Sequence, residues 1–485
     1  MTGRMTGKAF RAALTASVFI SAASIAQAQE VPSSAQDAKI ADLQRQVDEL
    51  KAIVSALQAA KAPVAPAPVE MAGSAGSAAS PAPVQMAAAA PAPAAVPAEK
   101  KKKGWYEKLM IRGYTQLRVS EIISGDKTAP AGVSRLRSPH DSGINENGNF
   151  SIRRARLVVQ GDISDRVSLY MQGELAGSVS NQSNGESRLN YMQMRDAYAD
   201  VYLDKAKTLK VRLGQSKIPF GWENLQSSSN RLPLDRSDAI NSPIPGERDL
   251  GVVVYYTPPR IQGIWDELSH EGQKLFGNYG ALGFAVYNGQ TINRVEKTDG
   301  VMLIGMATMP FRLDGLGGIF EGQVAEIGAS GMLNTFKPEV RTGGVSATAF
   351  KDNHVGVHAM IYPRPFGIQA EWTWGKGPQW DATTGSIQVK KASGGYVMGM
   401  LRATDTPVGQ IIPFARYQHY RGGWKIATNA PRLETDEYEV GVEWLPMKEL
   451  EFTLGYSNVS RTETDDRRTG RAKGDLVRAQ VQWNY

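Results

Sequence analysis

The chain has 485 residues, a formal charge of +7, 42% hydrophobic residues and no cysteine. This length is too great for one ordinary soluble core, although a single large β-barrel could contain it. The lack of cysteine excludes disulfides, thiolate metal ligands and cysteine nucleophiles. No run of 18 or more apolar residues follows the N-terminal region, which excludes a membrane-spanning helix there.

The first 28 residues are typical of a secretory signal peptide. Residues 12–25 are small and apolar, residues 26–28 read Ala-Gln-Ala, and a basic region precedes them, formed by Arg4, Lys8 and Arg11. Cleavage after Ala28 would lower the formal charge from +7 to +4 by removing three basic residues. So weak a charge does not favour a nucleic-acid partner, which needs a clustered basic surface. The alternative is a short helix of the mature protein.

Residues 29–61 are predicted to form a coiled-coil helix. Their apolar residues are spaced alternately three and four apart, at Ile40, Leu43, Val47, Leu50, Val54 and Leu57. Since one helix cannot bury this stripe against itself, we expect self-association. The β-branched residues at one seam position favour two strands, but about three heptads do not fix the number. The alternative is an amphipathic helix docked on the rest of the chain.

Residues 62–103 are predicted to be an extended periplasmic linker. Up to residue 99 this segment is rich in alanine and proline and has no aromatic residue, so it cannot bury a core. Residues 100–103 are four consecutive lysines. They are interpreted either as a contact with lipid headgroups or cell-wall polymer (peptidoglycan), or as a solvated run before a domain.

From residue 104 onward, apolar and polar residues alternate in segments of about ten residues. In residues 475–485, Val477, Val481 and Trp483 share one face of the expected strand, whereas Arg478 and Gln482 share the other. The same alternation predicts sixteen strands, near 111–119, 150–163, 166–176, 192–203, 208–216, 249–257, 276–288, 301–311, 320–333, 354–363, 366–375, 391–403, 409–420, 435–446, 449–460 and 475–485. A further segment, 345–351, alternates poorly and is expected to be loop.

The expected connections alternate between short and long, as periplasmic turns and extracellular loops do in outer-membrane barrels. One long connection, 258–274, falls on the short side and does not fit this pattern. The sequence therefore predicts a 16-stranded antiparallel transmembrane β-barrel over residues 104–485. A barrel of this width leaves space that side chains cannot fill, and charged residues on its inner face require water. We therefore expect a water-filled channel; the alternative is a soluble β-sandwich.

Three segments carry a family resemblance. Residues 150–157 read Phe-Ser-Ile-Arg-Arg-Ala-Arg-Leu, residues 195–198 read Arg-Asp-Ala-Tyr, and residues 212–221 read Arg-Leu-Gly-Gln-Ser-Lys-Ile-Pro-Phe-Gly. They resemble the phosphate-selective porin O and P family, and the likeness covers residues 104–485. It implies a trimeric, 16-stranded outer-membrane porin whose third extracellular loop folds inward. The terminal Tyr485 resembles the signal read by the barrel-assembly machinery, in which Phe is commoner.

The third long connection, 217–248, is the expected constriction, with the charged residues Lys217, Arg231, Asp235, Arg236, Asp238 and Glu247. The alternative is a loop that caps the barrel from outside.

The expected pore wall carries basic residues on the polar parity of their strands, namely Arg112, Arg118, Arg154, Arg156, Lys210 and Arg212. Guanidinium groups suit phosphate and carboxylate, which favours anions. The competing interpretation is that these residues pair with lumen acids such as Glu174, Asp196 and Asp200. Arg153 has the opposite parity and is expected near the rim.

An enzyme is not predicted. His354 and His358 lie four residues apart on one expected strand, about 13 Å from each other, which is too far to share a metal. The sequence gathers no catalytic triad and no metal or cofactor site. The expected function is passive diffusion of small hydrophilic solutes across the outer membrane with a moderate anion preference, phosphate being one candidate. The alternative is a structural tether that joins the outer membrane to the cell wall through the coiled coil.

Overall fold

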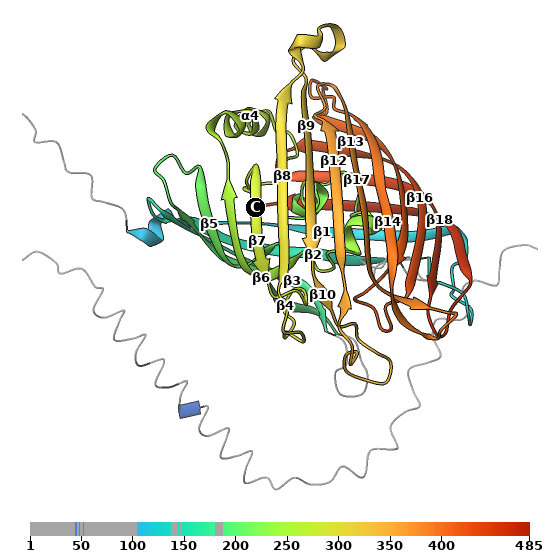
Figure 1. The fold of residues 1–485 in the computed structure, drawn as a ribbon. Coiled ribbons are helices and arrows are strands. Elements are labelled where there is room, and N and C mark those ends of the chain that lie inside the picture. Colours follow the sequence, from blue (N-terminus) through green and yellow to red (C-terminus); the bar gives the residue numbers. More distant parts are fainter. Residues whose placement is uncertain are drawn as a thin grey trace, which may run out of the picture. The chain divides into compact units, whose positions relative to one another are not determined.

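The computed structural model contains a closed β-barrel (Figure 1). It describes residues 104–136, 144, 148–179 and 188–485, together with the helical positions Gln44, Arg45, Asp48 and Ala52. The chain divides into two units, 1–97 and 98–485, and the barrel belongs to the second. The predicted signal peptide and linker, and all but those four positions of the predicted coiled coil, lie outside the described residues.

The prediction of a 16-stranded antiparallel barrel is confirmed. Within the described residues each barrel strand pairs with its neighbour along the chain, and β1 pairs with β18 to close the sheet. The strands are β1 (Met110–Gly125), β2 (Asn149–Ser164), β3 (Val167–Val179), β4 (Arg188–Tyr202), β5 (Leu209–Lys217), β6 (Arg248–Tyr256), β7 (Leu282–Tyr287), β8 (Met302–Arg312), β9 (Val324–Leu333), β12 (Asn353–Ile361), β13 (Phe366–Asp381), β14 (Ser386–Leu401), β15 (Gln410–Gly423), β16 (Arg432–Met447), β17 (Leu450–Thr464) and β18 (Arg471–Asn484).

The alternation of residues decides which side chains face the lumen. On β18, Arg478, Gln480 and Gln482 are buried inside the barrel, whereas Trp483 is 40% exposed on the outer face. Closure gives every strand two neighbours, so the backbone amides have partners without water. The outer surface can therefore be apolar while the lumen is polar, as the sequence predicted.

The remaining elements lie in the connections. A two-residue ladder joins β10 (Thr335–Phe336) to β11 (Phe350–Lys351), and β11 lies in the segment 345–351 that the sequence predicts to be loop. Short helical turns are η1 (Trp105–Lys108), η2 (Asp314–Leu316) and η3 (Gly318–Phe320). No helix of the described residues combines the length and the apolar character needed to cross a membrane.

The long connection on the short side contains a helix, α4 (Pro259–His270). Proline at its first position suits a helix start, and Ile264, Trp265 and Leu268 follow at helical spacing and are buried. These side chains pack with Phe276 and other residues of the barrel. The predicted strand 276–288 is therefore too long, because its first residues pack with α4 and β7 begins only at Leu282.

Candidate pore constriction

The third long connection folds into the barrel. Residues 218–247 are almost all buried and contain two short helices, α2 (Trp222–Leu225) and α3 (Asp238–Asn241). Leu232 and Ile240 pack with Tyr396 and Phe414, which belong to the wall strands β14 and β15. Figure 1 shows this green segment within the barrel. The loop therefore narrows the lumen rather than covering its mouth.

The start of the loop is fixed by a carboxylate on the wall. Glu371 of β13 accepts backbone N–H groups from Trp222 (2.7 Å) and Glu223 (3.0 Å). Gly221 precedes them with φ +81°, and a Cβ there would lie 2.7 Å from Glu371 Oε1. Glycine therefore allows both the left-handed turn and the close approach to the carboxylate.

The centre of the loop is held through Asp235. Its carboxylate pairs with Arg118 of β1 (3.1 Å), Arg153 of β2 (3.5 Å) and Arg478 of β18 (2.7 Å). Burial favours the neutral acid, but the three nearby guanidinium groups hold the pKa of Asp235 well below its ordinary value. Asp235 thus joins the loop to three strands in its charged form.

Two further acids of the loop reach β15, β16 and β17, the strands that follow β18 around the barrel. Asp238 pairs with Arg461 of β17 (2.8 Å) and accepts a hydrogen bond from Thr435 of β16 (2.6 Å). Glu223 pairs with Arg416 of β15 (3.4 Å). The negative charge of the loop is therefore engaged by arginines of the wall.

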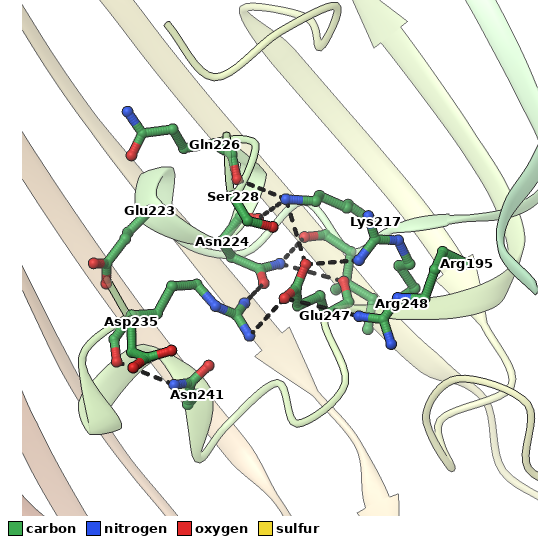
Figure 2. Close-up of polar contacts among 12 residues, drawn as sticks. Arg195, Lys217, Glu223, Asn224, Gln226, Ser228, Asp235, Asn241, Glu247 and Arg248 are labelled. Carbon is green, nitrogen blue, oxygen red and sulfur yellow. Dashed lines mark hydrogen bonds and ion pairs between the residues drawn. The ribbon is translucent and has the colours of Figure 1, made fainter. Parts of the chain in front are cut away.

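The end of the loop is a cluster of cations around Glu247, part of which Figure 2 shows. The Glu247 carboxylate lies 2.6 Å from Arg248, 3.2 Å from Arg236, 3.5 Å from Lys217 and 3.9 Å from Arg195. Burial works against ionisation, but these cations keep the pKa of Glu247 well below its ordinary value. One carboxylate is therefore surrounded by four positive groups.

Two buried arginines of the constriction, one on the wall and one on the loop, lack a carboxylate partner among the described residues. Arg154 donates to the amide oxygen of Gln116 (2.8 Å) and forms no ion pair there. Arg231, on the loop, has Nε and Nη1 without hydrogen-bond partners in the same part of the chain. Burial lowers the pKa of Arg231, since nearby acids offset only part of the desolvation. Buried charges without partners are costly, so these two groups favour an anion beside them.

The other predicted wall residues also face the lumen, but most are engaged. Arg118 holds Asp235, Arg156 pairs with Glu174 (2.7 Å), and Asp200 pairs with both Lys210 (3.3 Å) and Arg212 (2.7 Å). These ion pairs with Glu174 and Asp200 are the ones that the competing interpretation of the sequence expects. Two residues of the predicted set differ from the rest. Arg112 is exposed, and Arg154 has no carboxylate partner among the described residues.

The position of Arg153 differs from the expectation of a rim residue. Gln116 lies opposite Arg154 whereas Leu117 lies opposite Ile152, which leaves Arg153 as the extra residue of a β-bulge. Arg153 therefore reaches Asp235 together with its neighbours. Three further residues anchor the loop but were not predicted, namely Arg416, Arg461 and Glu371. The alternation of polar and apolar residues along its strand does mark Arg416 as a lumen residue.

The predicted lumen histidines have separate neighbours. His354 lies 2.9 Å from Asp352, and His358 lies 2.9 Å from the hydroxyl of Thr308. The terminal Tyr485 pairs its backbone with Gly113 of β1 and is 54% exposed. Its role as an assembly signal stays a prediction.

Two cavities lie on either side of the inward loop and share no lining residue. The cavity at the end with the long loops has a volume of about 860 Å³ and is lined by Lys127, Arg135, Arg341, Arg467 and Arg468 against Glu463 and Asp465. The cavity at the other end measures about 490 Å³. Its lining includes Arg112, Tyr170, Tyr198, Asn278 and Tyr279.

A closed 16-strand barrel with a polar lumen and an inward loop defines the class of outer-membrane porins. The phosphate-selective porin O and P family matches residues 130–271 and 333–485, so the chain belongs to that family. The protein is thus an outer-membrane porin, a class of channels rather than of enzymes.

The chain is also similar to solved porins and outer-membrane proteins at low sequence identity. OmpF of Salmonella typhi in complex with daunomycin is 12% identical, with a TM-score of 0.46 over 78% of this chain and 97% of that chain. The anion-selective porin of Comamonas acidovorans is 12% identical, with a TM-score of 0.42 over 78% and 99%. OmpT of Vibrio cholerae is 9% identical, with a TM-score of 0.41 over 78% and 97%. No curated protein matches the chain.

Proposed function

We propose that this porin is a water-filled diffusion channel that prefers small anions, with phosphate among its solutes. The observation that supports this most directly is the pair of buried arginines, Arg154 and Arg231, without a carboxylate partner among the described residues. The loop acids do not cancel them, because Asp235, Asp238 and Glu223 are each engaged by other arginines.

The expected size of the preference follows from electrostatics. A unit charge 4 Å from an ion contributes about 1 kcal/mol even at the dielectric constant of water. That energy corresponds to about a fivefold change in the permeability of that ion. Two uncompensated guanidinium groups can therefore give a moderate anion preference without a closed binding site.

The cavity on the side of the long loops supports the same preference for anions. Its lining carries five basic and two acidic side chains. These acids pair with Arg341 and Arg468, so the described lining keeps an excess of positive charge, which raises the local concentration of anions. Anions are therefore expected to be enriched before they reach the constriction.

Phosphate is proposed as one solute because guanidinium groups donate paired hydrogen bonds that match its oxygens. The family description, phosphate-selective porin O and P, agrees with this choice. Arg154 and Arg231 are the residues that we expect to contact a passing phosphate.

The test is the reversal potential of the purified porin across a planar bilayer in a salt gradient. Changing Arg154 and Arg231 together to Gln should move the potential toward cations. Arg166→Gln is the matched control, because Arg166 is exposed on the turn between β2 and β3. An equal shift in both variants, or none in the double variant, would contradict the proposal.

We further propose a homotrimer in outer-membrane lipid, inserted by the barrel-assembly machinery, with the coiled coil in the periplasm. A tether to the cell wall through residues 29–103 is the second proposal that the sequence leaves open. The two roles are compatible, since the barrel can conduct while the extension binds.

A further inference from the structure

The cavity at the end with the short connections, here named the tyrosine vestibule, has a composition that the proposed function does not use. Tyr170, Tyr198 and Tyr279 line it beside Arg112 and Asn278. Its volume of about 490 Å³ lies in the range of about 300–1,000 Å³ that is usual for small-molecule sites. Aromatic rings among amides and arginines suggest more than a path for inorganic ions.

The rings form an ordered surface. Tyr170 and Tyr198 lie directly opposite each other on β3 and β4, and their rings stack with centres 5.1 Å apart and planes 10° apart. The Arg112 guanidinium lies 6.0 Å from the centre of the Tyr170 ring, and the Arg212 guanidinium lies 3.8 Å from that of Tyr198. Tyr170, Tyr198 and Tyr279 are only partly buried. A half-buried tyrosine offers an apolar ring and a polar hydroxyl to a solute.

Two side-chain amides of the vestibule are oriented through their oxygen atoms, which leaves their NH₂ groups available as donors. The side-chain oxygen of Asn278 accepts from Lys210 Nζ (2.8 Å), and that of Gln160 accepts from Arg112 (3.1 Å). Each interaction fixes the amide and leaves its NH₂ group to donate. Asn278 is exposed at the cavity surface. Such donors can bind the hydroxyl oxygens of an organic solute as well as phosphate oxygens.

The charge of the vestibule suits one anionic group. Arg112 is exposed and has no carboxylate partner among the described residues; its side chain donates a hydrogen bond to the amide oxygen of Gln160. The acids of the lining are engaged, since Asp162 pairs with Lys207 (3.1 Å), Asp196 with Arg248 (2.9 Å) and Asp200 with Arg212 (2.7 Å). The anion of a solute therefore meets a free guanidinium rather than a free carboxylate.

We infer that the tyrosine vestibule binds phosphorylated sugars as they pass. The apolar C–H face of the sugar ring lies against Tyr170 or Tyr279, its phosphate contacts Arg112, and its hydroxyls meet Asn278 and Gln160. A neutral sugar lacks the charge, phosphate lacks the ring, and an aromatic acid lacks the hydroxyls. This inference rests on the proposed function, because the solute has to reach the vestibule through an anion-preferring channel.

The test measures how solutes block the chloride current of the full-length porin in planar bilayers. Glucose 6-phosphate, glucose, inorganic phosphate and benzoate are added separately on the side of the short connections. Glucose 6-phosphate should reach half-block at a concentration about tenfold lower than each of the other three. Equal blocking by glucose 6-phosphate and phosphate would overturn the inference.

Variants identify the site. Tyr170→Ala should raise the half-blocking concentration of glucose 6-phosphate about fivefold, whereas Tyr170→Phe should keep it. Arg112→Gln should reduce blocking to the level of glucose. Tyr438→Ala is the matched control, because Tyr438 stacks across strands on Tyr417 (4.8 Å) but is 62% exposed on the outer wall. An unchanged value in both Tyr170→Ala and Arg112→Gln would refute the assignment.

Failure of this inference can be told apart from failure of the proposed function. A wild-type channel that prefers cations contradicts the anion preference itself. A channel that prefers anions but blocks alike with sugar phosphate and phosphate contradicts only the vestibule assignment. Calorimetric titration of the detergent-solubilised porin with glucose 6-phosphate gives a second readout that needs no current; no binding by wild type would also refute the inference.

Discussion

Neutralising Asp235 should increase the anion preference of the channel. In the wild type this carboxylate lies among Arg118, Arg153 and Arg478, at 3.1, 3.5 and 2.7 Å. Asp235→Asn keeps the shape of the side chain but removes its charge, so three cations then face the constriction without their shared acid. The loop should stay inside, because Glu371 and Asp238 still hold it.

The magnitude follows from the distances. One unit charge contributes about 1 kcal/mol at 4 Å and about 0.5 kcal/mol at 8 Å at the dielectric constant of water. An anion and a cation respond with opposite sign, so the ratio of anion to cation permeability changes by twice these energies, which is about 30-fold at 4 Å and about fivefold at 8 Å. We therefore expect about a five- to 30-fold rise in that ratio for Asp235→Asn, by the same relations.

The assay is the reversal potential in a potassium chloride gradient, with Asp165→Asn as the control. Asp165 carries the same charge, but it is exposed on the turn between β2 and β3 and lines neither cavity. This control should leave the ratio unchanged. A ratio that stays constant or falls in Asp235→Asn, with wild-type circular dichroism, would refute the electrostatic reasoning.

Three further predictions concern other parts of the chain. The pKa of Glu247 lies well below the ordinary value of 4.5 in the fold, so its stabilisation is present above 4.5 and is lost as pH falls from there toward the folded pKa. The folded carboxylate keeps its charge down to 4.5, so ion preference should hold from about pH 8 to 4.5 and change only well below it, unlike in Glu247→Gln. Trp265→Ala removes a buried ring and its hydrogen bond to Glu326 (3.0 Å), and should cost about 3 kcal/mol. Limited proteolysis should then cut α4 faster than in the exposed control His270→Ala, and equal rates would contradict the packing of α4. Deleting residues 29–99 should leave conductance intact and reduce co-sedimentation with cell-wall material; unchanged sedimentation would count against the tether.

The strands could be predicted from the sequence because a barrel in lipid imposes one rule on each of them. Apolar residues face out and polar residues face in, so a period of two is visible without tertiary contacts. The helix α4 also has a local signal in Pro259, Ile264, Trp265 and Leu268, which treating the segment as a connection overlooked.

The anchoring of the constriction could not be predicted in the same way. Asp235 meets Arg478 across 243 residues of sequence, and no periodicity reports such a contact. The bulge that turns Arg153 inward depends on the register between β1 and β2, which the alternation of one strand does not contain. The sequence therefore indicates which side chains face the lumen, but not which of them neutralise one another.

The most direct measurement is the current through the purified wild-type porin, with reversal potentials in chloride, phosphate and a small organic acid recorded side by side. Our account predicts ohmic conductance and a potential on the anion side for each salt. A porin without conductance, or one whose potential lies on the cation side, would contradict it.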